Sequence, residues 1–143
     1  MRHLQRVDKS GSIASTRGAA IRGAIAVSDN STDAIRSATR ELLSEIVTRN
    51  NLVLGDIYAA LFSMTKDLNA AFPGLFAREM GWGHVAMLHF VEVDVPRSME
   101  RCLRVLVQIN STHLQPDMRH VYLGGAAALR PDLAEGSDAF RHA

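Results

Sequence analysis

Cysteine, lysine and long apolar runs are all scarce in this sequence of 143 residues. The single cysteine, Cys102, excludes a disulfide within the chain and is typical of a protein from a reducing cytoplasm. No apolar run approaches the roughly 18 residues of a transmembrane helix, and the N-terminus lacks the apolar segment of a signal peptide. A net charge of +1 provides no field to attract nucleic acid or an anionic membrane. We therefore expect a cytoplasmic protein that binds neither nucleic acid nor a membrane.

The basic residues that are present are almost all arginines. Lysine occurs at positions 9 and 66, and the other basic side chains among the 16 are guanidinium groups. Arginine suits planar, bidentate recognition of carboxylates, so this bias is compatible with binding of a small anion, although a codon-usage bias explains it equally well. With 47% hydrophobic and 22% charged residues, the composition is that of an ordinary globular protein with one sizeable core.

The two ends of the chain differ in composition from the middle. Residues 1–19 are polar, rich in glycine and serine, and aperiodic, so we expect a disordered N-terminal extension. Residues 134–143 are expected to form a flexible C-terminal tail. Residues 20–133 are expected to form one compact domain.

Hydrophobic periodicity within this domain predicts two helices and five strands. The longer helix is predicted at 32–49, after a turn segment that supplies an N-cap, and a shorter one runs from Phe72-Pro73 to near Gly81. Strands are predicted at 21–27, 56–64, 84–92, 102–109 and 120–123.

This order of elements predicts an α+β fold, a mixed β-sheet with helices packed on one face. The other face then has to be buried by partner subunits, so we expect an oligomer.

Arg104 interrupts the predicted strand from Cys102 to Ile109, which is otherwise typical of a buried strand. Burying a guanidinium costs several kcal/mol unless an anion lies opposite. Such a group can hold a carboxylate or a developing oxyanion. Alternatively, its head reaches water or pairs with an Asp or Glu of the same chain.

Four further polar residues lie on or beside the predicted elements: Arg22, Arg78, Glu92 and Tyr122. Each alone has a structural explanation, as a strand-edge charge, a solvated helix residue, an ion-pair partner of Arg104 or a core tyrosine. Together with Arg104 they make three guanidiniums, one carboxylate and one phenol. No Ser-His-Asp arrangement, metal-ligand spacing or phosphate-binding glycine loop accompanies them. The set favours binding of a rigid dicarboxylate, without a metal or cofactor.

Six short segments occur in a fixed order along the domain: Ile21–Ala24, Thr65–Pro73, Gly81–Trp82, Arg101–Val105, Arg119–Leu123 and Leu129–Leu133. In this order and at this spacing they resemble the monofunctional chorismate mutases of the trimeric Bacillus type. The resemblance implies a homotrimer that forms a pseudo-α/β barrel with active sites at the subunit interfaces. It also implies an isomerase of aromatic amino acid biosynthesis, which converts chorismate to prephenate by a [3,3] rearrangement without a cofactor.

The resemblance also implies roles for four of the polar residues named above. Arg104 matches the cation beside the breaking ether oxygen, and Glu92 matches the carboxylate that accepts a hydrogen bond from the ring hydroxyl. Arg22 and Tyr122 match the pair that grips the side-chain carboxylate.

Two further segments complete the implied site. Phe72, Gly74 and Arg78 match a segment that lines the site from a neighbouring subunit. Leu129 and Arg130 match a C-terminal stretch that closes over it.

The sequence departs from this family at three positions. His89 stands where a small residue contacts the substrate, Leu88 where a hydroxyl residue can occur, and Leu75 where a lysine can stand near the ring carboxylate. We expect His89 to lie at the ring hydroxyl or Glu92, or only to line the pocket. These departures leave two alternatives open: action on a related enolpyruvyl ring acid such as isochorismate, or a non-catalytic ligand-binding trimer.

Overall fold

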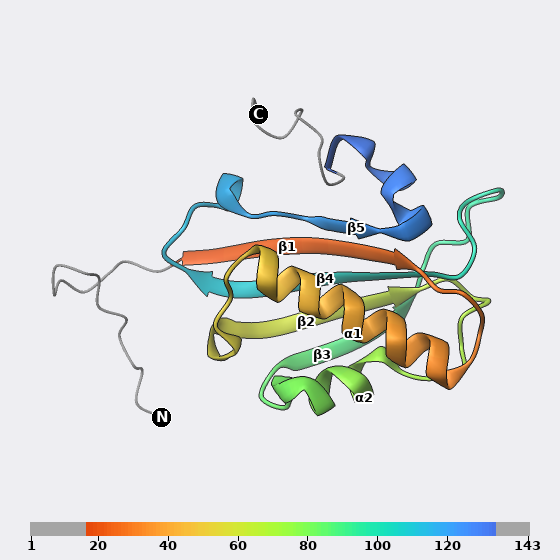
Figure 1. The fold of residues 1–143 in the computed structure, drawn as a ribbon, viewed down its shortest axis with the longest axis horizontal. Helices are drawn as coiled ribbons and strands as arrows, with labels where there is room; N and C mark the ends of the chain where they lie inside the picture. Colours follow the sequence, from red (N-terminus) through yellow and green to blue (C-terminus); the bar gives the residue numbers. More distant parts are fainter. Residues whose placement is uncertain (1–16, 134–143) are drawn as a thin grey trace, which may run out of the picture.

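A computed structural model describes residues 17–133 (Figure 1). Within this range one sheet holds all five strands, in the order β3-β2-β4-β1-β5. The strands are β1 (Arg17–Ala26), β2 (Ile57–Met64), β3 (Ala86–Val91), β4 (Cys102–Ser111) and β5 (Val121–Leu123). The helices are α1 (Thr32–Arg49) and α2 (Pro73–Ala77). The proposed tail at 134–143 and the first 16 residues of the proposed extension lie outside the described residues.

The sheet is mixed, as the sequence predicts. The central strand β4 is antiparallel to both of its neighbours, β1 and β2. The edge strands β3 and β5 run parallel to β2 and β1, respectively. Both helices lie in front of the sheet in Figure 1, so the predicted α+β architecture with helices on one face is confirmed. None of the described helices is long and apolar enough to cross a membrane.

Strand β1 begins earlier than the sequence indicates. It starts at Arg17, which pairs with Ser111, and Ala19 is already buried. The predicted boundary of the extension at residue 19 is therefore wrong by three residues, because 17–19 belong to the sheet. The local sequence Gly18-Ala19-Ala20 is too weakly apolar to mark a strand, and pairing with the long β4 supplies the missing interactions.

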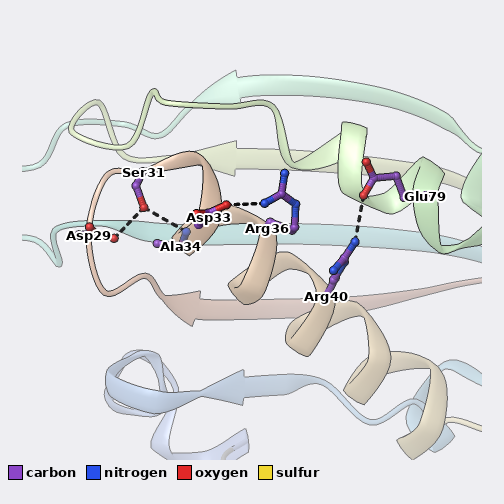
Figure 2. Close-up of polar contacts among 7 residues, drawn as sticks. All are labelled: Asp29, Ser31, Asp33, Ala34, Arg36, Arg40 and Glu79. Atoms are coloured by element: carbon purple, nitrogen blue, oxygen red, sulfur yellow. Dashed lines mark hydrogen bonds and ion pairs between the residues drawn. The ribbon is translucent and has the colours of Figure 1, made fainter.

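Helix α1 occupies the predicted range because its signals are local. Ser31 is the N-cap, and its Oγ accepts a hydrogen bond from the backbone N–H of Ala34 (Figure 2). The apolar stripe of α1 then packs on β1 so closely that a Cβ on Gly23 would lie 2.7 Å from Cδ1 of Ile46. Leu42 and Ile46 are completely buried by this contact.

Helix α2 begins at Pro73 and continues into a single π-type turn, Arg78–Trp82. Gly81, with a φ of 95°, breaks the helical conformation inside this turn, close to the predicted end of the helix, and glycine adopts that conformation without strain. Arg40 of α1 donates to Glu79 over 3.1 Å (Figure 2), which ties the two helical segments together. Trp82 is buried beneath them.

The two faces of the sheet have different neighbours. Alternate residues of β4, including Leu103 and Val105, are buried beneath the helices. The opposite face, which we call the open face, carries the intervening residues such as Arg104. At one end it is covered by a 3-10 helix, Gly124–Leu129, which the sequence did not predict. There a second small core forms from Ala24, Cys102, Tyr122 and Ala126.

Candidate active site

Arg104, Glu92 and Ser63 meet on the open face. Ser63 and Arg104 are partners on the antiparallel strands β2 and β4. Glu92 directly follows β3, and its backbone N–H donates to the carbonyl of Met64 over 2.8 Å. The Ser63 hydroxyl donates to Oε2 of Glu92 over 2.7 Å, and Nε of Arg104 lies 3.4 Å from the same oxygen. The carboxylate is thereby held between a serine and an arginine.

Arg104 is partly exposed. Its side chain is 41% exposed, because it lies on the open face instead of in the core. In the single chain this matches the alternative in which the head of the side chain reaches water or an acidic residue. The Nε atom of Arg104 is buried and makes no hydrogen bond, although Glu92 lies within ion-pair distance. Glu92 is the acidic partner that one interpretation of the sequence expected.

Arg22 and Tyr122 lie beside this pair because of the strand register. Ala24 of β1 is opposite Arg104 on one side and opposite Tyr122 on the other. Arg22 precedes Ala24 by two residues, so its side chain is on the same face. Tyr122 is 7% exposed and packs in the small core of the open face, whereas Arg22 is exposed.

The C-terminal segment brings a further guanidinium to Arg22. Arg130 forms two hydrogen bonds with the carboxylate of Asp132, of 3.0 and 2.8 Å. Leu129 packs against the small core that contains Tyr122. The predicted residues Leu129 and Arg130 therefore do lie at the same end of the open face as Tyr122.

His120 also belongs to this neighbourhood, although the sequence gives no sign of it. Its Nδ1 accepts a hydrogen bond from the backbone N–H of Arg22 over 2.9 Å. Burial, together with the charges of Arg22 and Arg130, lowers the pKa of His120 to about 4. The ring is thus neutral near pH 7. No local sequence signal identifies this role, because it depends on how β5 pairs with β1.

The remaining predicted residues form a separate group beside the edge strand β3. The imidazole of His89 stacks on Phe62, with ring centroids 5.2 Å apart, and its Nε2 accepts a hydrogen bond from the N–H of Gly74 over 3.0 Å. Phe72 contacts the same ring edge-on. Since Phe62 is a core residue, His89 lies on the helix-bearing face. Within one chain His89 does not lie beside Glu92, which contacts Ser63 of the open face, and its place in a site shared between copies stays a prediction.

The predicted site residues therefore fall into two groups. Arg22, Glu92, Arg104 and Tyr122 share the open face with Leu129 and Arg130 nearby, whereas Phe72, Gly74, Arg78 and His89 adjoin the edge strand on the helix-bearing side. A groove beside β3 is lined by residues that include Phe72, His89 and Phe90. Leu88 lies on the open side of β3 and is exposed. One chain does not bring the two groups together, which fits a site assembled from two copies.

Exposed apolar side chains surround this edge of the sheet. They include Phe72, Leu88, Phe90, Val91, Val93 and Val95. A concentration of exposed apolar side chains at one edge of a sheet is typical of a region that binds another protein chain. No group of three or more metal-binding side chains occurs within residues 17–133.

Comparison with known proteins identifies the family. The family model for chorismate mutase type I matches residues 19–133. The chain is 44% identical over 114 residues to chorismate mutase AroH of Thermus thermophilus, covering 79% of this chain and 93% of that protein. It is 36% identical over 115 residues to chorismate mutase AroH of Bacillus subtilis, covering 80% and 91%.

A solved structure agrees with this assignment. The chain superimposes on a chorismate mutase from Clostridium thermocellum with a TM-score of 0.74 at 47% identity, covering 76% of this chain and 97% of that one. This chain belongs to the chorismate mutase type I family, and the resemblance detected in the sequence is confirmed.

Proposed function

We propose that the open-face residues of one copy bind and activate chorismate in a site completed by the Phe72–Arg78 segment of another copy. The chain is a chorismate mutase, an isomerase of aromatic amino acid biosynthesis that converts chorismate to prephenate. The observation that carries the proposed site is the meeting of Arg104, Glu92 and Ser63 beside Arg22.

The reaction makes modest chemical demands on these residues. It is a unimolecular [3,3] shift that needs no proton transfer and no covalent intermediate. The protein has only to hold the compact conformer and to stabilise the separating charge. The thiol of Cys102 plays no part, since burial raises its pKa and keeps it protonated.

Arg104 stabilises the negative charge that develops on the ether oxygen as the C–O bond breaks. Its position on the central strand β4 and its ion pair with Glu92 hold the guanidinium before substrate arrives. A donor that is already in place has no reorganisation to undergo in the transition state.

Glu92 accepts the hydrogen bond of the substrate's ring hydroxyl. The side-chain contacts of Glu92 with Ser63 and Arg104 both use Oε2, which leaves Oε1 to face the substrate. Arg22 and Tyr122 bind the side-chain carboxylate, and Arg130, which is paired with Asp132, lies at the same end. Together these residues give a dicarboxylate substrate a cationic surface, and Glu92 provides one acceptor for its hydroxyl.

The site requires more than one copy of the chain, and we propose a homotrimer. The separation of the two residue groups and the exposed apolar residues near β3 support it. We also propose a cytoplasmic enzyme with neither cofactor, nucleic acid nor membrane as a partner, which agrees with the single, buried cysteine.

The alternative activity on an isochorismate-like acid rests on His89 and Leu88 near the substrate ring. His89 contacts Gly74, within the segment proposed to complete the site of another copy, so a comparison of the two substrates has to decide between the activities. A non-catalytic trimer would have no use for the polar set of Arg22, Glu92, Arg104 and Tyr122.

One experiment tests the proposed function and separates the alternatives. The purified protein is incubated with chorismate or with isochorismate, the ultraviolet absorbance of the substrate is followed, and the products are identified by chromatography. Conversion of chorismate to prephenate, with isochorismate turned over more slowly or not at all, is expected. Stable chorismate in the presence of the folded, oligomeric protein would overturn the proposal.

A further inference from the structure

The start of helix α2 lacks a capping residue of its own. Phe72 occupies the N-cap position and has no side-chain hydrogen bond to offer. Pro73, the first helical residue, has no N–H. Gly74 therefore carries the first backbone donor of this helix, a group that a Ser, Thr, Asp or Asn N-cap would normally help to satisfy.

His89 satisfies that donor from a different element. Its Nε2, on the edge strand β3, lies 3.0 Å from the backbone nitrogen of Gly74. The imidazole is fixed on both sides, by a stack on Phe62 with an interplanar angle of 13° and by an edge contact with Phe72 at 5.1 Å. The ring thus links the sheet, the residue before α2 and the first turn of α2.

The fit between His89 and Gly74 is tight enough to exclude any side chain at position 74. A Cβ there would lie 2.8 Å from Cε1 and 2.9 Å from Nε2 of His89, and 3.1 Å from Sδ of Met87. Gly74 does not have a positive φ, so its backbone conformation does not itself require glycine. Space against the histidine is the main reason for glycine at this position.

We propose that His89 is a positioning residue, which replaces the missing N-cap of α2 and holds the Phe72–Arg78 segment in the conformation that it presents to a neighbouring copy. The catalytic part of this inference rests on the proposed function. The capping part does not, because it concerns contacts within one chain.

The cap requires a neutral imidazole with its proton on Nδ1, so that Nε2 can accept. Burial, and to a smaller extent the charge of Arg78 on the adjoining π turn, lowers the pKa of His89 and favours this form. The other elements around the ring present Phe62 of β2, Phe72 before α2 and Met87 of β3, none of which titrates. Arg78 is itself part of the segment that His89 positions.

The first arm of the test compares His89→Gln with His89→Asn and His89→Ala. Glutamine carries its terminal amide near the place of Nε2 and can still accept from Gly74, whereas asparagine reaches only as far as Nδ1. Hydrogen–deuterium exchange is measured on the peptide covering residues 72–78. Exchange at Gly74 should accelerate in the Ala and Asn variants, by at least about fivefold as for loss of one hydrogen bond, and Gln should restore protection.

The second arm is a double-mutant cycle with Gly74→Ala. In the wild-type background this change should lower the melting temperature, since the new Cβ forces the imidazole aside. In the His89→Ala background it should be neutral or stabilising, because alanine favours a helix more than glycine does. This reversal of sign does not depend on any enzymatic activity.

The third arm is kinetic. His89→Ala should raise the KM for chorismate about fivefold or more while kcat changes less, because the segment binds substrate without bearing on the separating charge. As the pH falls below the ordinary histidine range, the KM of the wild type should rise relative to that of His89→Gln.

The outcomes test the capping role, the positioning role and the proposed function separately. Unchanged exchange at Gly74 in His89→Ala, or equal destabilisation by Gly74→Ala in both backgrounds, would overturn the capping role. Lost protection with an unchanged KM would overturn the positioning role in catalysis. If the wild type does not convert chorismate, the proposed function is wrong, while the exchange and melting data still test the capping role of His89.

Discussion

Arg104 and Glu92 form an ion pair on the open face of the sheet, with Nε of the arginine 3.4 Å from Oε2 of the carboxylate. The same oxygen accepts the hydroxyl proton of Ser63. The cation and the acceptor that the proposed mechanism needs therefore hold each other in place before substrate binds.

Removal of the Ser63 hydroxyl should impair catalysis modestly. Ser63→Ala frees Glu92 from one of its two contacts, so the carboxylate samples other positions, and kcat should fall roughly twofold to tenfold, as for loss of one hydrogen bond. Ser63→Thr keeps the hydroxyl and tolerates a β-strand, and serves as the matched control. Steady-state kinetics on both variants check this. An alanine variant with wild-type kcat and KM would show that Ser63 does not orient Glu92.

His120 should make the folded protein sensitive to acid. Its pKa is lowered from 6.5 to about 4 in the folded state, so the unfolded chain binds a proton first as the pH falls. Stability is then full above about pH 6.5 and decreases between that pH and about 4, by on the order of 1–2 kcal/mol after allowance for solvent screening.

The matched control is His120→Asn, whose Oδ1 takes the place of Nδ1 as acceptor for the N–H of Arg22 and does not titrate. Melting temperatures of both proteins are compared from pH 7.5 to 4. The wild type should lose stability relative to the asparagine variant over the lower part of this range. Parallel curves would rule out a contribution from His120.

Gly23→Ala should destabilise the fold. The new Cβ would lie 2.7 Å from Cδ1 of Ile46 and 3.1 Å from Cδ1 of Leu42, both of which are completely buried, so overpacking should cost about 1–3 kcal/mol. Gly55→Ala is the control, because nothing lies within 4 Å of a Cβ built there. Urea denaturation measures both. Equal midpoints would contradict the close packing of α1 on β1.

Charge on the apolar surface beside β3 should dissociate the oligomer. Phe90→Asp places a carboxylate among exposed apolar residues, where burial against another chain would be strongly unfavourable. Val53→Asp is the matched control. Val53 is similarly exposed, but it precedes the start of β2, at the other end of that strand. Sedimentation velocity should give about three times the 15.6 kDa mass of one chain for the wild type and the Val53 variant, and a smaller species for Phe90→Asp. A Phe90 variant of unchanged mass would place the interface elsewhere.

Local signals in the sequence predicted the helices well and the strand ends less well. The apolar spacing of α1 and its N-cap lie within one stretch of chain, and the predicted range 32–49 matches the structure. The start of β1 at Arg17 depends on pairing with Ser111, far away in the sequence. The 3-10 helix at Gly124–Leu129 is built from small residues without a periodic pattern.

The sequence predicts the site only in part, because some of its contacts join segments that are far apart in the chain. A charged residue in an apolar strand is visible in sequence, which identified Arg104, but contacts between distant strands are not. Ser63 and His120 act only through the register of β2 with β4 and of β1 with β5. The contact of His89 with Gly74 is likewise not visible in the sequence, because it joins β3 to α2. Three positions along an extended chain separate His89 from Glu92, and this odd spacing puts the two side chains of one chain on opposite faces.

The most direct test of the account is the kinetics of Arg104 variants in which the guanidinium is replaced by neutral citrulline, by Ala or by Lys. Circular dichroism and sedimentation first establish that each variant is folded and assembled as the wild type is. The account predicts that citrulline and Ala lower kcat by on the order of 100-fold or more with a smaller change in KM, and that Lys recovers little. A folded Ala variant with near-normal kcat and a raised KM would contradict it, since Arg104 would then only bind the substrate.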